Sequence, residues 1–280
     1  VTVDTIGPAA PTVSGAIRTN DEYPTWTWSH DPVDGNGIYQ YKFSTSGTWS
    51  AATTATSYSP TVGEGAFTLQ VQEQDFLGNW SATGSWQTTV DRTDPILNSI
   101  ILNSGAKYTS SASVTATISA VTAGETGLEM RFYDYNPAGW KPYQAFSSTK
   151  AITLPSGDGS KPVYVQIRDD VGNETDYSVN DSIILDTTAP TVTSFALNGG
   201  NTYTPSLRAI MNTAGADNNW NVSEVQIKHQ VSIGGGSFVT SGWQSYSSAV
   251  TTFSDFDKTV GTKYVRVKLR DGALNESGWS

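Results

Sequence analysis

Aspartates recur at two kinds of position in this sequence, and their carboxylate oxygens could bind a hard metal ion. The first kind ends an alternating segment shortly before a proline, and the second kind opens a turn of the form Asp-x-x-Gly-Asn or a close variant. Oxygen clusters of this type suit Ca²⁺, which takes about six to eight oxygen ligands. These aspartates are Asp4, Asp91, Asp94 and Asp186 in the first group and Asp75, Asp169, Asp170 and Asp271 in the second.

Other catalytic or metal-binding chemistry is hard to build from this composition. The sequence contains no cysteine, which excludes thiolate metal sites, cysteine nucleophiles and disulfide scaffolds. The two histidines, His30 and His229, lie far apart in the chain. The run Ser29-His30-Asp31 is not a catalytic triad, because triad residues come from converging elements and not from neighbours in sequence. We therefore expect that the protein is not an enzyme.

The balance of charge excludes further functions. Lysine and arginine number 16 against 26 aspartates and glutamates, so the formal net charge is −10. An acidic chain lacks the basic stripe that neutralises phosphates, so we expect no nucleic-acid partner. No apolar run approaches the ~20 residues of a membrane-spanning helix, so we expect no membrane insertion within this segment.

The joint aspartates and the turns recur together, which indicates three copies of one unit. The third turn keeps the Asp and the Asn but moves the Gly. Two independent markers that recur in the same order are poorly explained by chance. The joint copies are Val3–Pro8, Val90–Pro95 and Leu185–Pro190, and the turn copies are Asp75–Ser81, Asp169–Thr175 and Asp271–Ser277.

Alternating apolar residues precede each turn, as Val163, Val165 and Ile167 do in the second unit. A period of two predicts a strand with one buried face. Other segments predicted as strands are Thr25–Trp28, Tyr39–Phe43, Trp86–Val90, Val114–Ile118, Glu129–Tyr133, Ser182–Leu185 and Glu224–Val231. The predicted core residues are Trp28, Tyr41, Val71, Ile118, Phe132, Val165, Ile210, Ile227 and Val267.

Short strands separated by frequent turns are typical of antiparallel β-sandwiches. In the second unit, Ser99–Thr115, Val163–Asp169 and Ile184–Pro190 follow the pattern of bacterial immunoglobulin-like repeats, and in the first unit Pro24–Ser29 and Thr56–Pro60 are closer to fibronectin III. The whole chain resembles tandem repeats of these two kinds in large bacterial cell-surface proteins. This resemblance implies an all-β fold of three tandem immunoglobulin-like antiparallel β-sandwiches in an extended array, at an extracellular location on the bacterial cell surface.

The repeat markers predict three units at residues 5–91, 92–186 and 187–280. In the first two units another strand follows the turn, whereas only five residues follow Asn275. We therefore expect the third sandwich to lack its final strand and to have an unpaired sheet edge. Residues 1–4 are predicted to be the end of a preceding repeat, or a donor strand that completes the open sandwich of another copy. The donor strand would consist of Val1, Thr2, Val3 and Asp4.

An immunoglobulin-like sandwich would bring the two groups of aspartates together, because its last hairpin loop lies at the pole where the previous unit ends. Calcium at each joint would then stiffen the array, as it does in the surface adhesins that the chain resembles. The alternative is that Asp and Asn in a tight turn hydrogen-bond their own backbone, or that the joint aspartate caps the linker. The expected groups are Asp91 and Asp94 with Asp169 and Asp170, Asp186 with Asp271, and Asp4 with Asp75.

The nine tryptophans offer a second binding chemistry, because exposed aromatic rings can stack on sugar rings. Trp80 follows the first turn directly and is the residue that we predict to be an exposed glycan platform. The alternative for any of these rings is packing in the core or against a sheet edge.

These features together predict a non-catalytic extracellular stalk that spaces and displays surface components and takes part in adhesion. Its partners would be neighbouring repeats of the same protein and surface glycans or host and cell-surface proteins. One alternative is a subunit of a self-assembling filament, sheath or surface layer, joined head to tail by strand donation. The other is an accessory carbohydrate-binding module of a large secreted hydrolase.

Overall fold

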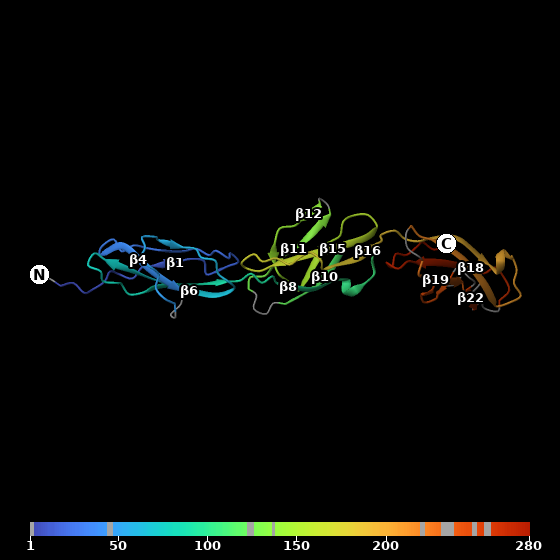
Figure 1. Ribbon diagram of the computed structural model, residues 1–280. Helices are drawn as coiled ribbons and strands as arrows, with labels where there is room; N and C mark the ends of the chain where they lie inside the picture. Colours follow the sequence, from blue (N-terminus) through green and yellow to red (C-terminus); the bar gives the residue numbers. More distant parts are fainter. Residues whose placement is uncertain are drawn as a thin grey trace.

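The computed structural model describes residues 3–43, 47–121, 126–135, 138–218, 222–230, 238–247, 251–254 and 259–280. Throughout these ranges the regular structure is β-strand, apart from two 3₁₀ turns, η1 (Asn103–Gly105) and η2 (Asn198–Gly200). Among the same residues, no helix is long and apolar enough to cross a membrane. Figure 1 shows the strands gathered into three bodies in a row, with the N-terminus at one end of the row.

The first body is formed by β1 (Val13–Ser14), β2 (Arg18–Thr19), β3 (Trp26–Trp28), β4 (Gly35–Phe43), β5 (Ser57–Tyr58), β6 (Gly65–Asp75) and β7 (Gly84–Val90). One of its sheets has the order β1-β3-β5 and the other the order β2-β7-β6-β4. All of these pairs are antiparallel except β2 with β7. The parallel pair matters below, because β7 ends one residue before the first joint aspartate.

The second body is formed by β8 (Ile96–Leu102), β9 (Tyr108–Thr109), β10 (Ser113–Val121), β11 (Glu129–Tyr135), β12 (Ala138–Trp140), β13 (Gln144–Ala145), β14 (Thr149–Thr153), β15 (Gly159–Arg168) and β16 (Asn180–Leu185). Its sheets have the orders β14-β10-β8 and β12-β11-β15-β16-β9, with β13 also paired to β11. The short strand β9 runs parallel to β16, as β2 runs parallel to β7. The first two bodies therefore end in the same way.

The third body is formed by β17 (Thr191–Leu197), β18 (Arg208–Ala216), β19 (Glu224–Gln230), β20 (Phe238–Thr240), β21 (Gln244–Ser245), β22 (Thr251–Ser254) and β23 (Val265–Arg270). Its sheets are β17-β18-β22 and a second one in which β19 pairs with β20, β21 and β23. Within the described ranges β23 pairs with β19 on one side, and on its other side residues 276–280 hydrogen-bond to it as far as Val267. β6 and β15 each have a further strand on both sides. The expected unpaired edge is therefore limited to the part of β23 that precedes Val267.

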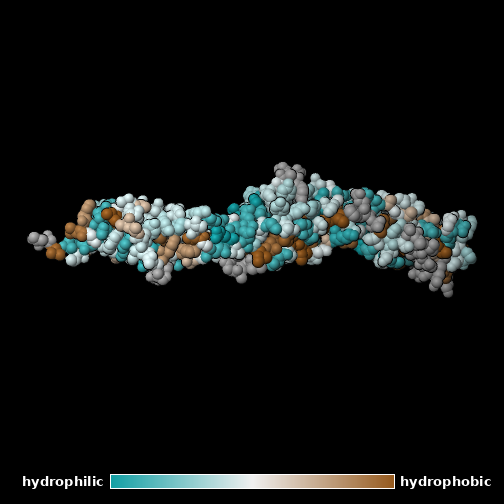
Figure 2. All heavy atoms as spheres, viewed as in Figure 1, coloured by the Kyte–Doolittle hydropathy of each residue, from teal (hydrophilic) through white to brown (hydrophobic). Residues whose placement is uncertain are grey.

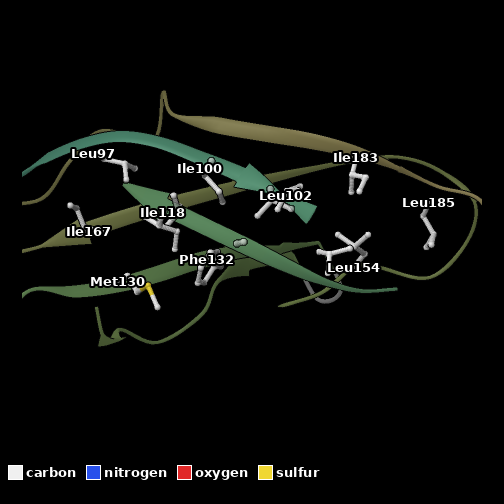
Figure 3. Packing of buried hydrophobic residues seen from close by; sticks show 14 residues of the cluster. Leu97, Ile100, Leu102, Ile118, Met130, Phe132, Leu154, Ile167, Ile183 and Leu185 are labelled. Carbon is white, nitrogen blue, oxygen red and sulfur yellow. The ribbon is translucent and has the colours of Figure 1, made fainter. Parts of the chain in front are cut away.

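Each body has its own apolar core, because the inward residues of its two sheets meet. In the second body, Val165 and Ile167 on β15 are completely buried and pack with Leu102 and Ile118 from the other sheet. Figure 3 shows Leu102, Ile118 and Ile167 among the side chains that lie between the two layers. Similar clusters lie in the first body around Trp26 and in the third around Val267, Leu269 and their neighbours. The structure is thus all-β and sandwich-like, with mostly antiparallel sheets.

The predicted core residues are buried except for Ile210 and Tyr41, and Tyr41 is half-buried and packs against the core of the first body. Ile210 is 47% exposed, whereas Ala209 and Met211 on either side of it are 1% exposed. Three consecutive apolar residues do not show which of them face the core and which face solvent, and choosing the bulkiest branched residue does not resolve this. The prediction for Ile210 was wrong because β18 turns Ala209 and Met211 toward the core.

Candidate functional site at the joints between the units

Each repeated turn is a closed hydrogen-bonded loop at the end of a strand. Asp169 Oδ1 accepts the backbone N–H groups of residues 171–173 at 2.7–3.0 Å. Asn173 Nδ2 donates to Asp169 Oδ2 at 2.8 Å. The aspartate ends the strand because its side chain satisfies N–H groups that would otherwise need a neighbouring strand. Very similar bonds close the loops Asp75–Asn79 and Asp271–Asn275.

The asparagine of each turn also reaches the chain that arrives from the preceding segment. Its Nδ2 atom donates to the backbone carbonyl of the joint aspartate, so one side chain closes the turn and holds the linker. The structure therefore brings the turn aspartates and the joint aspartates together, as expected. The distances are 3.3 Å from Asn79 to Asp4, 3.0 Å from Asn173 to Asp91 and 2.8 Å from Asn275 to Asp186.

A carboxylate from the preceding unit caps each linker. Glu64 Oε1 accepts the N–H of Arg92 at 2.9 Å and the hydroxyl of Thr93 at 2.8 Å. Asp158 occupies the corresponding place before the second joint, and its Oδ1 accepts the N–H and hydroxyl of Thr187 at 2.9 and 2.8 Å. Hydrogen bonds from these linker groups lower the pKa of both carboxyls, that of Asp158 to about 2. Both linkers are therefore held from the unit before and the unit after.

Arg18 supplies positive charge at the first joint. Its Nη2 atom lies 2.7 Å from Asp91 Oδ2 and 3.4 Å from Asp170 Oδ1, and its Nη1 atom donates to Thr126 Oγ1 at 2.7 Å. The guanidinium thus connects the first unit to two segments of the second. Figure 2 shows hydrophilic residues gathered around this joint.

The oxygens at the first joint already have donors. Asp91 Oδ1 accepts the N–H of Thr93 at 3.1 Å, and both oxygens of Asp169 are used by its own turn. Asp94, which we grouped with them, is exposed. Calcium at this joint stays a prediction, and no free buried carboxylate oxygen of Asp91 or Asp169 favours it.

Three aspartates meet at the second joint. Asp186, Asp217 and Asp271 each place a carboxylate oxygen within 4.8 Å of the other two. Asp186 and Asp271 are completely buried, and Asp217 is half-buried. The Oδ2 atoms of Asp186 and Asp217 are buried and have no hydrogen-bond partner in the part of the chain that the structure describes.

The electrostatics of this cluster are unfavourable as it stands. Burial raises the pKa of Asp186 and of Asp217 above the usual range, and the negative charges of Asp271 and Asp158 raise them further. A raised carboxyl pKa means that the surroundings penalise the charged form. The second joint therefore carries charge that its described residues do not neutralise.

The N-terminal group is different. Asp4, Asp34 and Asp75 also place oxygens within 4.8 Å of one another, but Asp4 and Asp34 are exposed. The buried member, Asp75, already accepts hydrogen bonds from its own turn at both oxygens. Of the proposed donor strand, Val1 and Thr2 lie outside the described residues, and Val3 is 84% exposed. The carboxylates of Asp4, Asp34 and Asp75 therefore form a solvated surface cluster.

The sequence reasoning missed Arg18 and Asp217. Asp217 belongs to no repeated motif, so only the fold brings it to the joint. Arg18 and Tyr108 each precede the threonine that ends a short parallel strand beside a joint, Thr19 in the first unit and Thr109 in the second. An alignment of the repeats on these two threonines would have placed Arg18 and Tyr108 at equivalent positions. The repeats therefore contained a signal for Arg18, whereas the motifs at the joints and turns indicate only the aspartates and asparagines.

Trp80 is half-buried rather than fully exposed. It forms a β-bridge with Gln74, and its carbonyl oxygen would lie 2.3 Å from a Cβ on Gly7, so the incoming chain passes close to it. The most exposed apolar side chains at this turn are Phe76 at 82% and Leu77 at 71%. Glycan binding at Trp80 stays a prediction.

Comparison with known proteins does not add to this description. No family model matches the sequence, and a search of the curated proteins finds no match. The function must therefore be argued from the geometry of the three bodies and of the joints between them.

Proposed function

We propose that the chain is a non-catalytic extracellular spacer that holds surface components apart, displays them and takes part in adhesion. The observation that carries this proposal is the repeated set of hydrogen bonds at the joints. One asparagine side chain, one capping carboxylate and one backbone N–H of the joint aspartate hold each linker. Linkers held on both sides resist bending, which is the property that a spacer needs.

The shape of the molecule supports the same proposal. The three bodies follow one another in a row and touch through short linkers (Figure 1). Units within a chain move relative to one another by default, unless their interface is large and hydrophobic. Here hydrogen bonds and ion pairs across the joint oppose that motion, and Arg18 contacts both Asp170 and Thr126 across the first joint. The extracellular location rests on the resemblance of the repeats to those of bacterial surface proteins.

A structural role for the histidine site also favours a non-catalytic protein. His30 Nδ1 hydrogen-bonds to Glu73, which is completely buried. The other oxygen of Glu73 accepts the N–H of Asp31 at 2.8 Å, and Oε1 also accepts the N–H of Gly37 at 3.1 Å. A buried carboxylate whose two oxygens accept this many hydrogen bonds holds a loop in place, which is a structural role.

Electron microscopy of the purified chain at low and high concentration tests the spacer proposal. We expect single rods of three bodies at every concentration, with little variation in the angle at the first joint. Particles that fold back on themselves, or a broad range of angles at that joint, would contradict the proposal.

Strand donation is the second candidate function, and the edge of β23 before Val267 favours it, because no described strand pairs with that side there. In the second unit, the strand beside β15 buries Ile183 and Leu185. In the third unit, exposed apolar residues lie along the corresponding groove, with Tyr203 89% and Val260 98% exposed. An extended segment with alternating apolar residues would cover this groove. Filaments that grow with concentration in the same micrographs, and that are lost when residues 1–4 are deleted, would establish this candidate.

A further inference from the structure

The two joints differ at one position that the repeat makes directly comparable. In both, a short parallel strand ends in a threonine whose carbonyl accepts the N–H of the joint aspartate at 2.9 Å. The residue before that threonine is Arg18 in the first unit and Tyr108 in the second. The same backbone position therefore presents a cation to one joint and a neutral ring to the other.

The difference between Arg18 and Tyr108 changes the environment of the Oδ2 atom of the joint aspartate. At the first joint, Asp91 Oδ2 accepts a hydrogen bond from Arg18 Nη2 at 2.7 Å. At the second joint, the ring of Tyr108 lies against the backbone of Gly272, where an added Cβ would be 3.0 Å from it. Asp186 Oδ2 is buried in a residue that is 0% exposed, and none of the described residues donates to it.

The groups around Asp186 do not compensate its charge. Asp217 Oδ2 is a second buried oxygen without a partner among the described residues, and Asp271 uses its oxygens in its own turn. Asp158 accepts hydrogen bonds from a threonine hydroxyl and an asparagine amide of the joint. Lys107 Nζ lies over the Tyr108 ring at 5.0 Å, and no described lysine or arginine forms an ion pair with any of the four carboxylates.

We propose that the second joint binds one divalent cation of the size of Ca²⁺ between Asp186, Asp217 and Asp271, and that Arg18 replaces such an ion at the first joint. Buried charge is strongly unfavourable unless it is paired or coordinates a metal. Here two buried carboxylate oxygens have no partner among the described residues, and they belong to aspartates that each place an oxygen within 4.8 Å of the other. The first joint contains its own cation, whereas the second must take one from solution. Backbone carbonyls and water would complete the shell of oxygen ligands.

The separation of the carboxylates is compatible with calcium. Calcium–oxygen distances of about 2.3–2.6 Å allow two ligands on opposite sides of the ion to be about 4.6–5.2 Å apart. The three aspartates have oxygens within 4.8 Å of one another, which is within that reach. Calcium also accepts irregular coordination, whereas magnesium requires a nearly ideal octahedron of ligands.

The site would join two units, because Asp186 belongs to the second and the other two aspartates to the third. Binding would therefore stiffen the second joint and leave the first unchanged. The site itself does not depend on the spacer function. If calcium does not bind, the spacer proposal still stands or falls on the shape of the particles.

Titration of CaCl₂ into the full chain after EDTA treatment tests the site, with thermal unfolding as a second readout. We expect one ion per chain, a dissociation constant between about 10⁻⁶ and 10⁻³ M, and a melting temperature that rises with calcium. Asp217→Asn should weaken binding at least tenfold. In EDTA the same variant should melt no lower than the parent chain, because it removes one of several like charges.

Two further variants separate the site from general effects. Tyr108→Arg should bring an internal cation to Asp186, raise the melting temperature in EDTA and remove the response to calcium. Asp34→Asn, in the solvated N-terminal cluster, should leave calcium binding unchanged. The proposal is overturned if the parent chain shows no binding at about 10 mM CaCl₂. It is also overturned if Asp217→Asn binds like the parent chain, if Asp34→Asn removes the binding, or if Tyr108→Arg keeps the full response.

Discussion

Arg18→Met removes the cation of the first joint while it keeps an apolar stem that can cover the same surface. The variant loses the 2.7 Å bond to Asp91, the 2.7 Å bond to Thr126 and the contact with Asp170. The side chains of Arg18 and Asp91 are only 25% and 18% exposed, so water replaces the lost partner poorly. We therefore expect the free energy of unfolding of the first unit to fall by about 2 kcal/mol, within the usual range for hydrogen bonds to charged groups.

Arg92→Met is the matched control, because Arg92 lies on the linker of the same joint and pairs with Glu22. That pair is longer, at 3.3 Å, and its side chains are 35% and 42% exposed. Exposed ion pairs contribute about 0–1 kcal/mol, so this variant should unfold almost like the parent chain.

Urea unfolding of the full chain, followed by tryptophan fluorescence, measures both variants. Five of the nine tryptophans lie in the first unit, so the signal reports mainly on it. A loss of about 2 kcal/mol corresponds to a shift of the midpoint on the order of 1 M urea. Free energies of unfolding for Arg18→Met and Arg92→Met that agree within about 0.5 kcal/mol would refute the role given to Arg18.

Three further predictions concern the turns, the linker and the core. Asn173→Ala should lower the thermal stability by about 2 kcal/mol, because it leaves one buried and one part-buried acceptor without a donor. Asn79→Ala, whose cross-joint bond is 3.3 Å long, should cost less than about 1 kcal/mol. The pKa of Asp158 is lowered to about 2 from 3.8, so its stabilising effect is complete above the unfolded value and is lost as pH falls toward 2; melting temperatures measured down that range should fall less in Asp158→Asn than in the parent chain. Met211→Ala should cost about 2–5 kcal/mol in urea unfolding, whereas Ile210→Ala should cost less than about 1 kcal/mol, and the reverse order would contradict the parity of β18.

The sequence was sufficient to predict the all-β class and most of the core, because alternation along single strands is a local property. Val163, Val165 and Ile167 alternate with polar residues, and all three are buried. The prediction of the buried face failed at Ile210. Three apolar residues follow one another there, and only packing against the opposite sheet decides which of them are buried.

The positions of the turns were predictable for a similar reason. Asp169 and Asn173 carry the whole loop within five residues, so their spacing is enough to predict the turn. The partner of Asn173 across the joint, and the place of Arg18 and Asp217, depend on how one unit docks on the next. No local pattern encodes that arrangement, and it required the structure.

The central claim is that the joints fix the units in a row. Because the chain has no cysteine, pairs of introduced cysteines can be spin-labelled without background at the exposed residues Ser85 and Thr117, which span the first joint, and at Thr117 and Ser194, which span the second. The distance distribution measured by pulsed electron paramagnetic resonance should be a single narrow peak across the first joint with or without calcium, and should narrow across the second joint when calcium is added. A broad distribution across the first joint would contradict the account.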